Sequence, residues 1–356
     1  MRYLLAGGGT GGHVNPLLAL AEAIRADDAT AQVVALGTAE GLEAKLVPER
    51  GFELLTVEKL PFPRKVSLYA IKFLPRLAKA VEVCRGIIRD RKIDVVVGFG
   101  GYASAPAYLA AALERVPLVI HEANALPGLA NRLGAGIAKA TAVSFRNTPL
   151  KNAVVTGMPL RSEIVLAASA PDRAKARKHF GLDTDSPTLL VTGGSLGAKR
   201  INEVINSAES VLSAAGIQIL HIVGGGSELK PLKQKGYVRM TYCDRMDLAI
   251  LAADFAISRA GASTVSEFNA LGLPALYLPY AVGNGEQSRN IEEVVRMKGA
   301  ITISDSQFDR DFVSDHLVSV ISNTKQLKAM SKAAKGCGNL DGTQLLLKMV
   351  KGVLPA

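Results

Sequence analysis

The stretch RYLLAGGGTGGH, residues 2–13, places a short apolar run directly before a cluster of glycines, and an apolar helical pattern follows at 16–24. A strand, a glycine turn and a helix in this order form the first step of a parallel sheet. The second half repeats the arrangement, because TLLVTGGSLGA at 188–198 precedes a helical pattern at 201–212. The repeat predicts two domains of one kind.

Further short apolar runs predict buried strands in each half. We expect them at 32–36, 95–98, 118–121, 153–156, 218–223, 255–258, 275–279 and 300–303. Because they alternate with helical stretches, both halves are predicted to be doubly wound α/β domains with parallel sheets. The turn-like TGMP at 156–159 marks the predicted change of domain. Two such domains facing each other would leave a cleft at the carboxyl ends of both sheets, where ligands of open α/β sheets bind.

The composition of the 356 residues is that of a globular protein, with 48% hydrophobic and 21% charged residues. No apolar run approaches the length of a membrane-spanning helix, and the apolar start of the chain is too short for a signal peptide. Cys84, Cys243 and Cys337 are odd in number and far apart, which favours a reducing compartment and no metal site. We therefore expect a cytoplasmic protein.

Positive charge is concentrated in one part of the chain. Between Arg64 and Lys92 only Glu82 and Asp90 are acidic, and the stretch carries +7 of the whole-chain +10. Its nine basic residues are Arg64, Lys65, Lys72, Arg76, Lys79, Arg85, Arg89, Arg91 and Lys92. Such a cluster predicts an anionic partner, either a lipid headgroup surface or nucleic acid. No recognised nucleic-acid-binding module accompanies it, so the membrane is favoured and nucleic acid is not expected.

The first glycine cluster matches G-x-G-x-x-G through Gly7, Gly9 and Gly12. Such glycines allow close approach of a ligand, and the following helix N-terminus favours an anion. The match fits a dinucleotide-binding oxidoreductase or a tight turn without a ligand. The acidic residue that dinucleotide enzymes place after the second strand is missing, because GTA occupies 37–39.

His13 directly follows these glycines, at the mouth of the predicted cleft. An exposed imidazole there can accept a proton at neutral pH. A histidine with a purely structural role is the alternative.

The stretch SRAGASTVSE, residues 258–267, follows a predicted strand and enters a helix. Its small residues expose free backbone N–H groups, which can bind a diphosphate without a metal. Glu267, one turn into the helix, can accept hydrogen bonds from the two hydroxyls of a ribose. A capped helix start with Glu267 as its first-turn acid is the alternative.

Five motifs in fixed order resemble those of the MurG family of glycosyltransferases. They are GGTGGH at 8–13, GGY at 100–102, HEAN at 121–124, GGS at 193–195 and the stretch 258–267. The resemblance covers nearly the whole chain. It implies the GT-B fold, in which two Rossmann-like domains face each other across a cleft and the last helix crosses back onto the first domain. The domains are then expected at 1–158, with the helix 341–356 packed on it, and at 159–340.

The resemblance also implies a reaction. Members of this family add N-acetylglucosamine from UDP-N-acetylglucosamine to the 4-hydroxyl of undecaprenyl-diphospho-muramoyl-pentapeptide (lipid I). The product, lipid II, serves peptidoglycan synthesis, and through it cell wall biogenesis, cell shape and cell division. The enzyme would be a peripheral protein on the cytoplasmic face of the cell membrane. Neither a metal nor a cofactor is implied.

Site residues follow from the matching positions. The donor would lie mainly on the second domain, with Ser195 at the diphosphate and Glu267 at the ribose. Cys243 matches a position whose backbone meets the uracil, and Arg161 matches a donor-binding arginine. The other predicted binding residues are Thr10, Gly11, Gly12, Asn124, Ala262, Ser263, Thr264, Val265, Ser266, Gln287 and Asn290.

Gln287 and Asn290 match the amides that read the sugar hydroxyls. The chain departs from the family pattern just before them, where it reads GNGE at 283–286. Many relatives carry an acidic residue and two glutamines before this asparagine. Gln287 and Asn290 keep the family spacing, whereas the expectation for the finer sugar contacts does not extend to Asn284 and Glu286.

For catalysis we expect inversion at the anomeric carbon, with His13 as the general base. A carboxylate of the acceptor domain, such as Glu122, is an alternative that could share this role. Backbone donors at helix N-termini would stabilise the leaving diphosphate. The remaining alternatives are another UDP-sugar glycosyltransferase of GT-B fold, a non-catalytic nucleotide-sugar-binding protein and a dinucleotide oxidoreductase.

The basic stretch predicts a membrane-facing surface. On a helix, Lys72, Arg76 and Lys79 share one face, and Tyr69 and Phe73 are expected beside it. An apolar patch rimmed by bases is typical of proteins that lie on an anionic leaflet. A merely solvated basic face is the alternative. Pro75 is expected to interrupt any single helix through the region.

Overall fold

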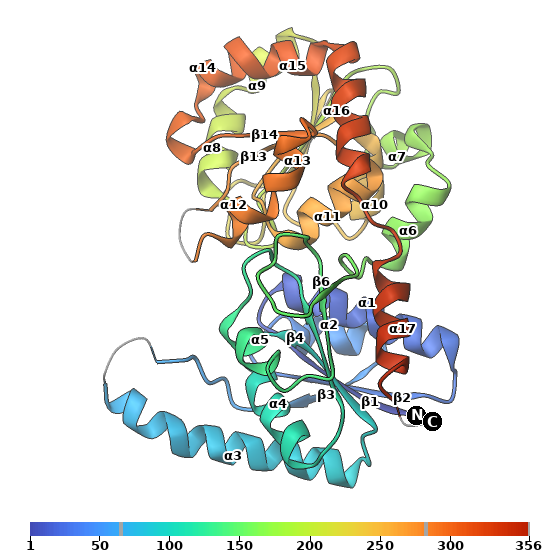
Figure 1. Cartoon of the computed structure of the whole chain (residues 1–356). Coiled ribbons are helices and arrows are strands. Elements are labelled where there is room, and N and C mark those ends of the chain that lie inside the picture. The colour runs from blue at the N-terminus through green and yellow to red at the C-terminus, as the bar shows by residue number, and fades with distance from the viewer. Residues whose placement is uncertain (64–66, 281–283, 355–356) are drawn as a thin grey trace. The chain divides into compact units, whose positions relative to one another are not determined.

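The structure, a computed structural model, describes residues 1–63, 67–280 and 284–354. Arg64 and Lys65 of the basic stretch, Gly283 of the departing segment and the last two residues of the predicted C-terminal helix lie outside the described residues. The chain divides into two compact units (Figure 1). Unit 1 comprises Met1–Arg161 and Asp341–Ala356, and unit 2 comprises Ser162–Leu340. The predicted doubly wound α/β class is confirmed in each unit.

Unit 1 contains a seven-stranded sheet in the order β3-β2-β1-β4-β5-β6-β7. All of its neighbouring strands pair in parallel. The strands are β1 Arg2–Gly7, β2 Gln32–Gly37, β3 Glu53–Thr56, β4 Val95–Gly100, β5 Leu118–Glu122, β6 Ala140–Val143 and β7 Val154–Val155. The central strands β1, β4 and β5 are buried along nearly their whole length, because helices cover both faces of the sheet.

The helices of unit 1 are α1 Gly11–Asp27, α2 Glu43–Glu49, α3 Leu68–Asp90, α4 Ser104–Leu113, α5 Leu129–Gly134 and α17 Gly342–Lys351. One core forms where α1 and α17 pack on the sheet, and it includes Leu17, Leu20 and Leu346. A second core, with Cys84 and Ile88 of α3, forms with α4 on the sheet. The last helix therefore completes the first unit, and α17 lies beside α1 in Figure 1.

The helical pattern at 16–24 lies within α1, which starts earlier, at Gly11, so His13 belongs to its first turn. The prediction that Pro75 interrupts the helix was wrong. The helix α3 is continuous from Leu68 to Asp90, with Pro75 inside it. Phe73 before the proline and Ala80 after it pack in one cluster with Leu60, which holds the helix on both sides of Pro75.

Unit 2 contains a seven-stranded sheet in the order β10-β11-β9-β8-β12-β13-β14. Its strands are β8 Thr188–Thr192, β9 Gln218–Ile222, β10 Leu232–Gln234, β11 Tyr237–Met240, β12 Phe255–Ser258, β13 Ala275–Tyr277 and β14 Ala300–Thr302. The edge strand β10 is antiparallel to β11, and the other pairs are parallel. The short strands β3, β6, β10 and β11 were not predicted, because their sequences are short or polar.

The helices of unit 2 surround this sheet. They are α6 Ser162–Ser169, α7 Arg173–Phe180, α8 Lys199–Ser207, α9 Glu209–Ala214, α10 Met246–Ala252, α11 Ala262–Leu271, α12 Glu286–Asn290, α13 Glu292–Arg296, α14 Arg310–Phe312, α15 Val318–Ser322 and α16 Thr324–Gly336. The predicted helix at 201–212 is therefore divided into α8 and α9. Among the described residues, no helix combines the length and apolarity needed to cross a bilayer.

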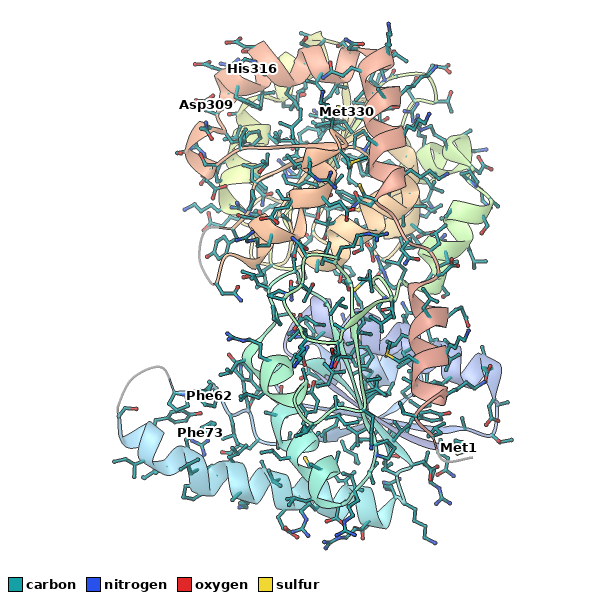
Figure 2. The ribbon with its side chains drawn as sticks, in the orientation of Figure 1. Met1, Phe62, Phe73, Asp309, His316 and Met330 are labelled. Carbon is teal, nitrogen blue, oxygen red and sulfur yellow. The ribbon has the colours of Figure 1, made fainter. Side chains whose placement is uncertain are left out.

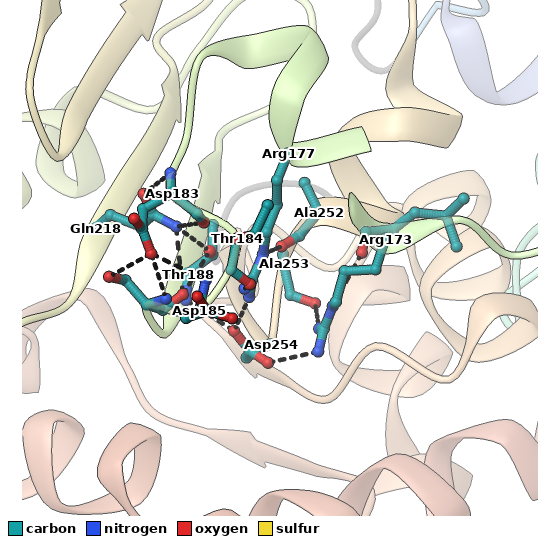
Figure 3. A network of polar contacts seen from close by, with 12 residues as sticks. Arg173, Arg177, Asp183, Thr184, Asp185, Thr188, Gln218, Ala252, Ala253 and Asp254 are labelled. Carbon is teal, nitrogen blue, oxygen red and sulfur yellow. Dashed lines mark hydrogen bonds and ion pairs between the residues drawn. The ribbon is translucent and has the colours of Figure 1, made fainter. Parts of the chain in front are cut away.

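A polar network holds the amino-terminal side of β8 and β12 (Figure 3). Asp254, which precedes β12, accepts the backbone N–H of Thr188 at 2.8 Å. Its carboxylate also pairs with Arg173 at 2.8 Å and with the buried Arg177 at 2.7 Å. A buried guanidinium is tolerated only with such partners. This end of the sheet is fixed by charge pairs, which leaves the opposite, carboxyl end to the glycine-rich loops.

In both sheets the chain reverses the direction in which it adds strands at a comparable point. In unit 1 the chain runs outward from the neighbours β1 and β4, and in unit 2 from β8 and β12. Loops at the carboxyl ends of such neighbouring strands form the usual ligand site of open α/β sheets. The predicted motifs at 8–13 and 100–102 follow β1 and β4, and those at 193–195 and 258–267 follow or end β8 and β12.

Candidate active site

The glycine loop of unit 1 positions His13. Gly9 has φ +91°, a conformation that favours glycine, and it turns the chain from β1 into α1. The Nδ1 atom of His13 lies 3.0 Å from the carbonyl oxygen of Gly8 and 3.4 Å from the hydroxyl of Thr10. The carbonyl can only accept, so Nδ1 carries the proton in that bond. In this tautomer the lone pair lies on Nε2.

The loop after β4 lies against this histidine. Gly100 has φ +88° and Gly101 has φ +90°. A Cβ added to Gly100 would lie 3.2 Å from Nε2 of His13, and one added to Gly101 would overlap the carbonyl group of Gly8. Only glycines allow the two loops to approach this closely. The structure therefore brings the motifs at 8–13 and 100–102 together.

Glu122 organises the loop that follows β5. Its Oε1 accepts the backbone N–H of Asn124 at 2.8 Å. Its Oε2 accepts the N–H of Gly128 at 3.0 Å and the side-chain amide of Asn131 at 2.9 Å. The side chain is buried, with 1% of the residue exposed. Through these contacts Glu122 stabilises the loop that follows β5. A role for Glu122 as a general base beside His13 stays a prediction.

Asn131 and Tyr108 extend this network, and neither was predicted from the sequence. The hydroxyl of Tyr108 donates to Asn131 at 2.7 Å, and the N–H of Gly100 donates to the same hydroxyl at 3.3 Å. Burial raises the pKa of Tyr108 well above its usual range, so the hydroxyl keeps its proton. The network connects the loop after β5 to the loop after β4. A buried Asn in a helix start gives no sequence signal of such a role.

His121, near the end of β5, is fully buried and contacts the protein backbone. Its Nε2 lies 3.2 Å from the carbonyl oxygen of Gly157. Burial lowers the pKa of His121 to about 4, so the ring is neutral near pH 7. The motif HEAN at 121–124 thus supplies two buried groups and the half-buried Asn124, whose carbonyl accepts the hydroxyl of Thr148 at 3.3 Å.

In unit 2 the loop after β8 is exposed around Ser195. Gly194 and Gly197 have positive φ angles of +85° and +84°. The carbonyl of Ser195 accepts the N–H of Gly225 at 2.9 Å, which fixes the loop against the end of β9. An added Cβ at Gly197 would overlap the backbone of Val223. The loop leaves the Ser195 side chain on the surface at the carboxyl end of the sheet.

The first turn of α11 forms the second loop of this site. The helix starts at Ala262 after Gly261, and the N–H of Val265 is the first to bond within it, to the carbonyl of Gly261 at 3.0 Å. The preceding N–H groups of the turn have no partner within the helix, as at every helix start, and a ligand could use them. Thr264 and Ser266 are half-buried on this turn. The predicted donor loop 262–267 therefore coincides with a helix N-terminus.

Ser263 stands out within this turn. Its hydroxyl is buried, and it has no hydrogen-bond partner among the residues that the structure describes. Leaving such a group unpaired costs about 1–3 kcal/mol. Glu267 is also buried, one turn further along the helix. The orphaned hydroxyl is a feature that a ligand with acceptor oxygens would satisfy.

Gln287 and Asn290 hold the backbone just before α11. The side-chain oxygen of Gln287 accepts the N–H of Ala260 at 3.1 Å and that of Tyr280 at 3.0 Å. The side-chain amide of Asn290 donates to the carbonyl of Ala260 at 3.1 Å. The structure thus brings both amides to the loop 258–267, and their contact with a sugar stays a prediction.

The departing segment lies directly before these amides. Asn284 is exposed and Glu286 half-buried, and the side-chain oxygen of Asn284 accepts the N–H of Glu286 at 3.3 Å. Arg259 was not singled out from the sequence, although it holds the same region. Its guanidinium pairs with Asp305 through two hydrogen bonds of 2.6 and 2.9 Å.

The two remaining predicted residues lie on other elements. Cys243 is buried in the loop between β11 and α10. Arg161 is half-buried at the end of the first segment of unit 1. Their contact with a nucleotide stays a prediction.

The first half of α3 carries an exposed apolar surface. Ile71 is 71% exposed and Leu74 is 69% exposed, and Pro75 between the basic side chains is exposed as well. Lys72 and Lys79 are exposed along one edge of this surface. We name these five residues the α3 patch.

The prediction for the aromatic residues was wrong for Phe73, whereas Tyr69 lies beside the basic Arg76, whose guanidinium carbon is 5.4 Å from the centre of the Tyr69 ring. Phe73 is buried and packs edge-on against Phe62, with ring centroids 5.1 Å apart (Figure 2). The hydroxyl of Tyr69 donates to the carbonyl of Pro61 at 2.6 Å. Helical periodicity places both rings on the inner face of α3 with Leu77, and it places Ile71 and Leu74 outside.

The local charge is also smaller than the sequence predicts. Arg76 pairs with Glu58, which therefore has a lowered pKa. Arg91 pairs with Glu53 at 2.6 Å. Arg85 and Arg89 both pair with Glu114, and their hydrogen bonds lower its pKa to about 2. All three of these acids lie outside the basic stretch, so the sequence count missed them.

Comparisons with known proteins agree across the whole chain. Residues 3–143 match the glycosyltransferase family 28 N-terminal domain, and 188–346 match the C-terminal domain of the same family. A relative from Clavibacter michiganensis subsp. michiganensis is 51% identical, covering 99% of this chain and 97% of its own. A relative from Streptomyces coelicolor is 46% identical, covering 100% and 99%. Both are called UDP-N-acetylglucosamine--N-acetylmuramyl-(pentapeptide) pyrophosphoryl-undecaprenol N-acetylglucosamine transferase.

A solved structure supports the same assignment. The crystal structure of Acinetobacter baumannii MurG is 25% identical to this chain. It aligns with a TM-score of 0.76 and covers 99% of each chain. Sequence identity of 46% and 51% over the full length indicates membership of one family as well as a shared fold. The chain therefore belongs to the MurG family of glycosyltransferases, with both domains of glycosyltransferase family 28.

Proposed function

We propose that this enzyme transfers N-acetylglucosamine from UDP-N-acetylglucosamine to the 4-hydroxyl of lipid I, giving lipid II for peptidoglycan synthesis. The observation that carries the proposal is the full-length identity to relatives whose name states this donor and acceptor. The geometry of both units supports it, because each presents glycine-rich loops at the carboxyl ends of its central strands.

Unit 2 would bind the donor. The free N–H groups at the start of α11 and the orphaned hydroxyl of Ser263 suit the diphosphate, with Ser195 on the neighbouring loop. Glu267 would accept hydrogen bonds from the ribose hydroxyls. Gln287 and Asn290 would fix the loop and read the sugar. As the sugar leaves, these donors stabilise the negative charge that develops on the departing UDP.

Unit 1 would supply the proton acceptor. Because Gly8 binds the Nδ1–H of His13, the Nε2 lone pair can take the proton of the acceptor hydroxyl. The oxygen attacks the anomeric carbon as the bond from that carbon to the UDP oxygen breaks. Attack from the side opposite the leaving group inverts the configuration. The fully engaged contacts of Glu122 favour His13 over Glu122 as the base.

A dinucleotide oxidoreductase is disfavoured by the same loops. Its fingerprint needs an acid free to bind a ribose beyond the second strand. The acid that reaches the end of β2 is Glu43, which is buried and accepts the N–H of Thr38 at 2.8 Å. It therefore faces the protein backbone rather than a ribose.

The finer part of the proposal concerns the membrane. The α3 patch would lie on the anionic inner leaflet, where the lipid-linked acceptor is anchored. Ile71 and Leu74 would enter the headgroup boundary, and Lys72 and Lys79 would face the phosphates. The enzyme would then be peripheral, on the cytoplasmic face.

The test is a donor panel followed by turnover. Thermal shift with several UDP-sugars and NAD(P) identifies the nucleotide, and release of UDP is then measured with and without a lipid I analogue. We expect stabilisation by UDP-N-acetylglucosamine and UDP release that needs the acceptor. Stabilisation by NAD(P) alone would contradict the proposal, and binding without turnover would identify a nucleotide-sugar-binding protein.

A further inference from the structure

Glu43 is a buried acid directly behind the glycine loop. It is the first residue of α2, and none of its surface is exposed. Its Oε2 accepts the backbone N–H of Gly9 at 2.7 Å. Its Oε1 accepts both the N–H and the hydroxyl of Thr38, each at 2.8 Å. The carboxylate thus joins the end of β2 to the loop that carries His13.

The surroundings are shaped around this carboxylate. A Cβ added to Gly8, Gly37 or Gly41 would overlap the side chain of Glu43. All three partners in its hydrogen bonds are donors. An ionised carboxylate is an acceptor only, and in a buried place it needs such donors. A glutamine would direct its NH₂ group at one of these N–H groups.

One peptide group connects Glu43 with His13. The N–H that Glu43 accepts belongs to Gly9, and the carbonyl that faces Nδ1 of His13 belongs to Gly8. These two groups are the ends of the same amide. Donation of its N–H to a carboxylate draws electron density towards the carbonyl oxygen, which becomes a better acceptor. Hydrogen bonds in such a chain strengthen one another.

We infer that Glu43 is a positioning residue for His13, acting through the Gly8–Gly9 peptide. The carboxylate fixes the orientation of the peptide and strengthens the bond from its carbonyl to Nδ1–H. The imidazole is then held in the form whose Nε2 lone pair is available. The role in turnover rests on the proposed function, whereas the hydrogen-bonded chain itself does not.

The direct readout is nitrogen NMR of His13 in the full-length protein. The histidines are labelled with ¹⁵N, and the signal of His13 is assigned by its loss in His13→Gln. At about pH 8 a free imidazole is neutral, so the shifts report which nitrogen carries the proton. We expect the proton on Nδ1 in the wild type. A proton mainly on Nε2 in the wild type would overturn the inference, whatever the variants do.

Two variants separate positioning from stability. Glu43→Gln removes the carboxylate behind Gly9. Asp94→Asn removes a carboxylate that also accepts a backbone N–H, that of Arg2 at 2.7 Å, at the opposite end of β1. Both are expected to lower Tm. Only Glu43→Gln should give a mixture of the two neutral tautomers of His13, with the proton on Nδ1 or on Nε2. The same variant should lower kcat about tenfold to a hundredfold with little change in donor KM, since a misplaced catalytic group lowers the rate by up to about that much.

Each outcome is decisive. An unchanged His13 signal in folded Glu43→Gln overturns the inference, and so does an equal effect of Asp94→Asn on that signal. If Glu43→Gln does not fold, Thr38→Val replaces it, because it deletes one bond to Oε1 and leaves that to Gly9. Its His13 signal should shift partway, and no shift would count against the chain. Loss of transferase activity in the wild type, with the Nδ1 proton in place, would reject only the proposed function.

Discussion

The side-chain oxygen of Gln287 accepts the backbone N–H of Ala260 at 3.1 Å. The side-chain amide of Asn290 donates to the carbonyl oxygen of the same residue. Two side-chain amides from the short helix α12 therefore hold the backbone that leads into α11. The start of α11 is therefore positioned before any ligand arrives. Preorganised backbone donors are more effective than mobile ones, because no reorganisation accompanies charge development.

Ser263→Ala is expected to separate donor binding from stability. Its hydroxyl has no partner among the described residues, so its removal should leave Tm unchanged or slightly raised. The KM for UDP-N-acetylglucosamine should rise about tenfold to a hundredfold, because one hydrogen bond to a charged group contributes about 1.5–3 kcal/mol. The control is Ser207→Ala, which removes an exposed hydroxyl that bonds to the carbonyl of Val204 at 2.8 Å in the same unit and should leave KM unchanged. A lower Tm with unchanged KM in Ser263→Ala would assign that hydroxyl to the fold.

His13→Ala should lower kcat by roughly 10²–10⁴, the usual contribution of a positioned proton acceptor. Donor KM should change little, because most of the proposed donor-binding residues lie in unit 2. Steady-state kinetics with saturating donor measures both quantities. His316, an exposed histidine in unit 2, provides the matched control through His316→Ala. Turnover of His13→Ala within a factor of about three of wild type would make His13 structural.

The α3 patch should bind anionic vesicles through two separable contributions. Lys72→Gln with Lys79→Gln should weaken binding about thirtyfold, since each base contributes about 1 kcal/mol, and this loss should fade at high salt. Ile71→Ser with Leu74→Ser should weaken binding at every salt concentration, because burial of apolar side chains is not screened.

Sedimentation with anionic and neutral vesicles measures this binding. Leu166→Ser, at a similarly exposed leucine of unit 2, is the control and should bind like the wild type. Equal binding by all variants would return the α3 patch to an ordinary exposed surface. Turnover of a water-soluble acceptor should be the same in all of them.

Two buried histidines should make stability fall in mild acid. Burial lowers the pKa of His121 to about 4 and that of His221 to about 3. Their folded values lie below the unfolded value of 6.5, so the unfolded chain binds more protons as the pH falls below 6.5. Each histidine should therefore remove about 2 kcal/mol from the free energy of unfolding between about pH 6.5 and 5.

Urea unfolding at the two pH values checks this loss. His121→Asn should reduce the pH dependence of unit 1, which contains His121, and leave that of unit 2 unchanged. An identical pH dependence in the variant would contradict the assignment of the loss to His121.

The sequence predicted the elements that local patterns specify. β12 has the predicted bounds, because an apolar run between turn residues suffices to define a buried strand. The glycine motifs predicted the turns at the carboxyl ends of the sheets. Local patterns also predicted two domains, since the strand, turn and helix recur.

Features that depend on distant contacts were missed. Glu43 is one acid among several in a polar stretch, and only folding brings it behind Gly9. Asn131 likewise gives no signal until α5 lies beside Glu122. The prediction of which side chains of α3 face outward was wrong because apolar residues occur all around its first turns. Which of them face inward is decided by Leu60 and Leu77, with which Phe73 packs.

The central claim is the identity of the transferred sugar and its acceptor. The most direct test incubates the purified enzyme with UDP-N-acetylglucosamine and a lipid I analogue, then analyses the lipid product by mass spectrometry and NMR. We predict one added N-acetylhexosamine, joined through a β-linkage to the 4-hydroxyl of the muramoyl sugar, with one UDP released for each product. An unmodified acceptor, or UDP released at the same rate without acceptor, would contradict the account.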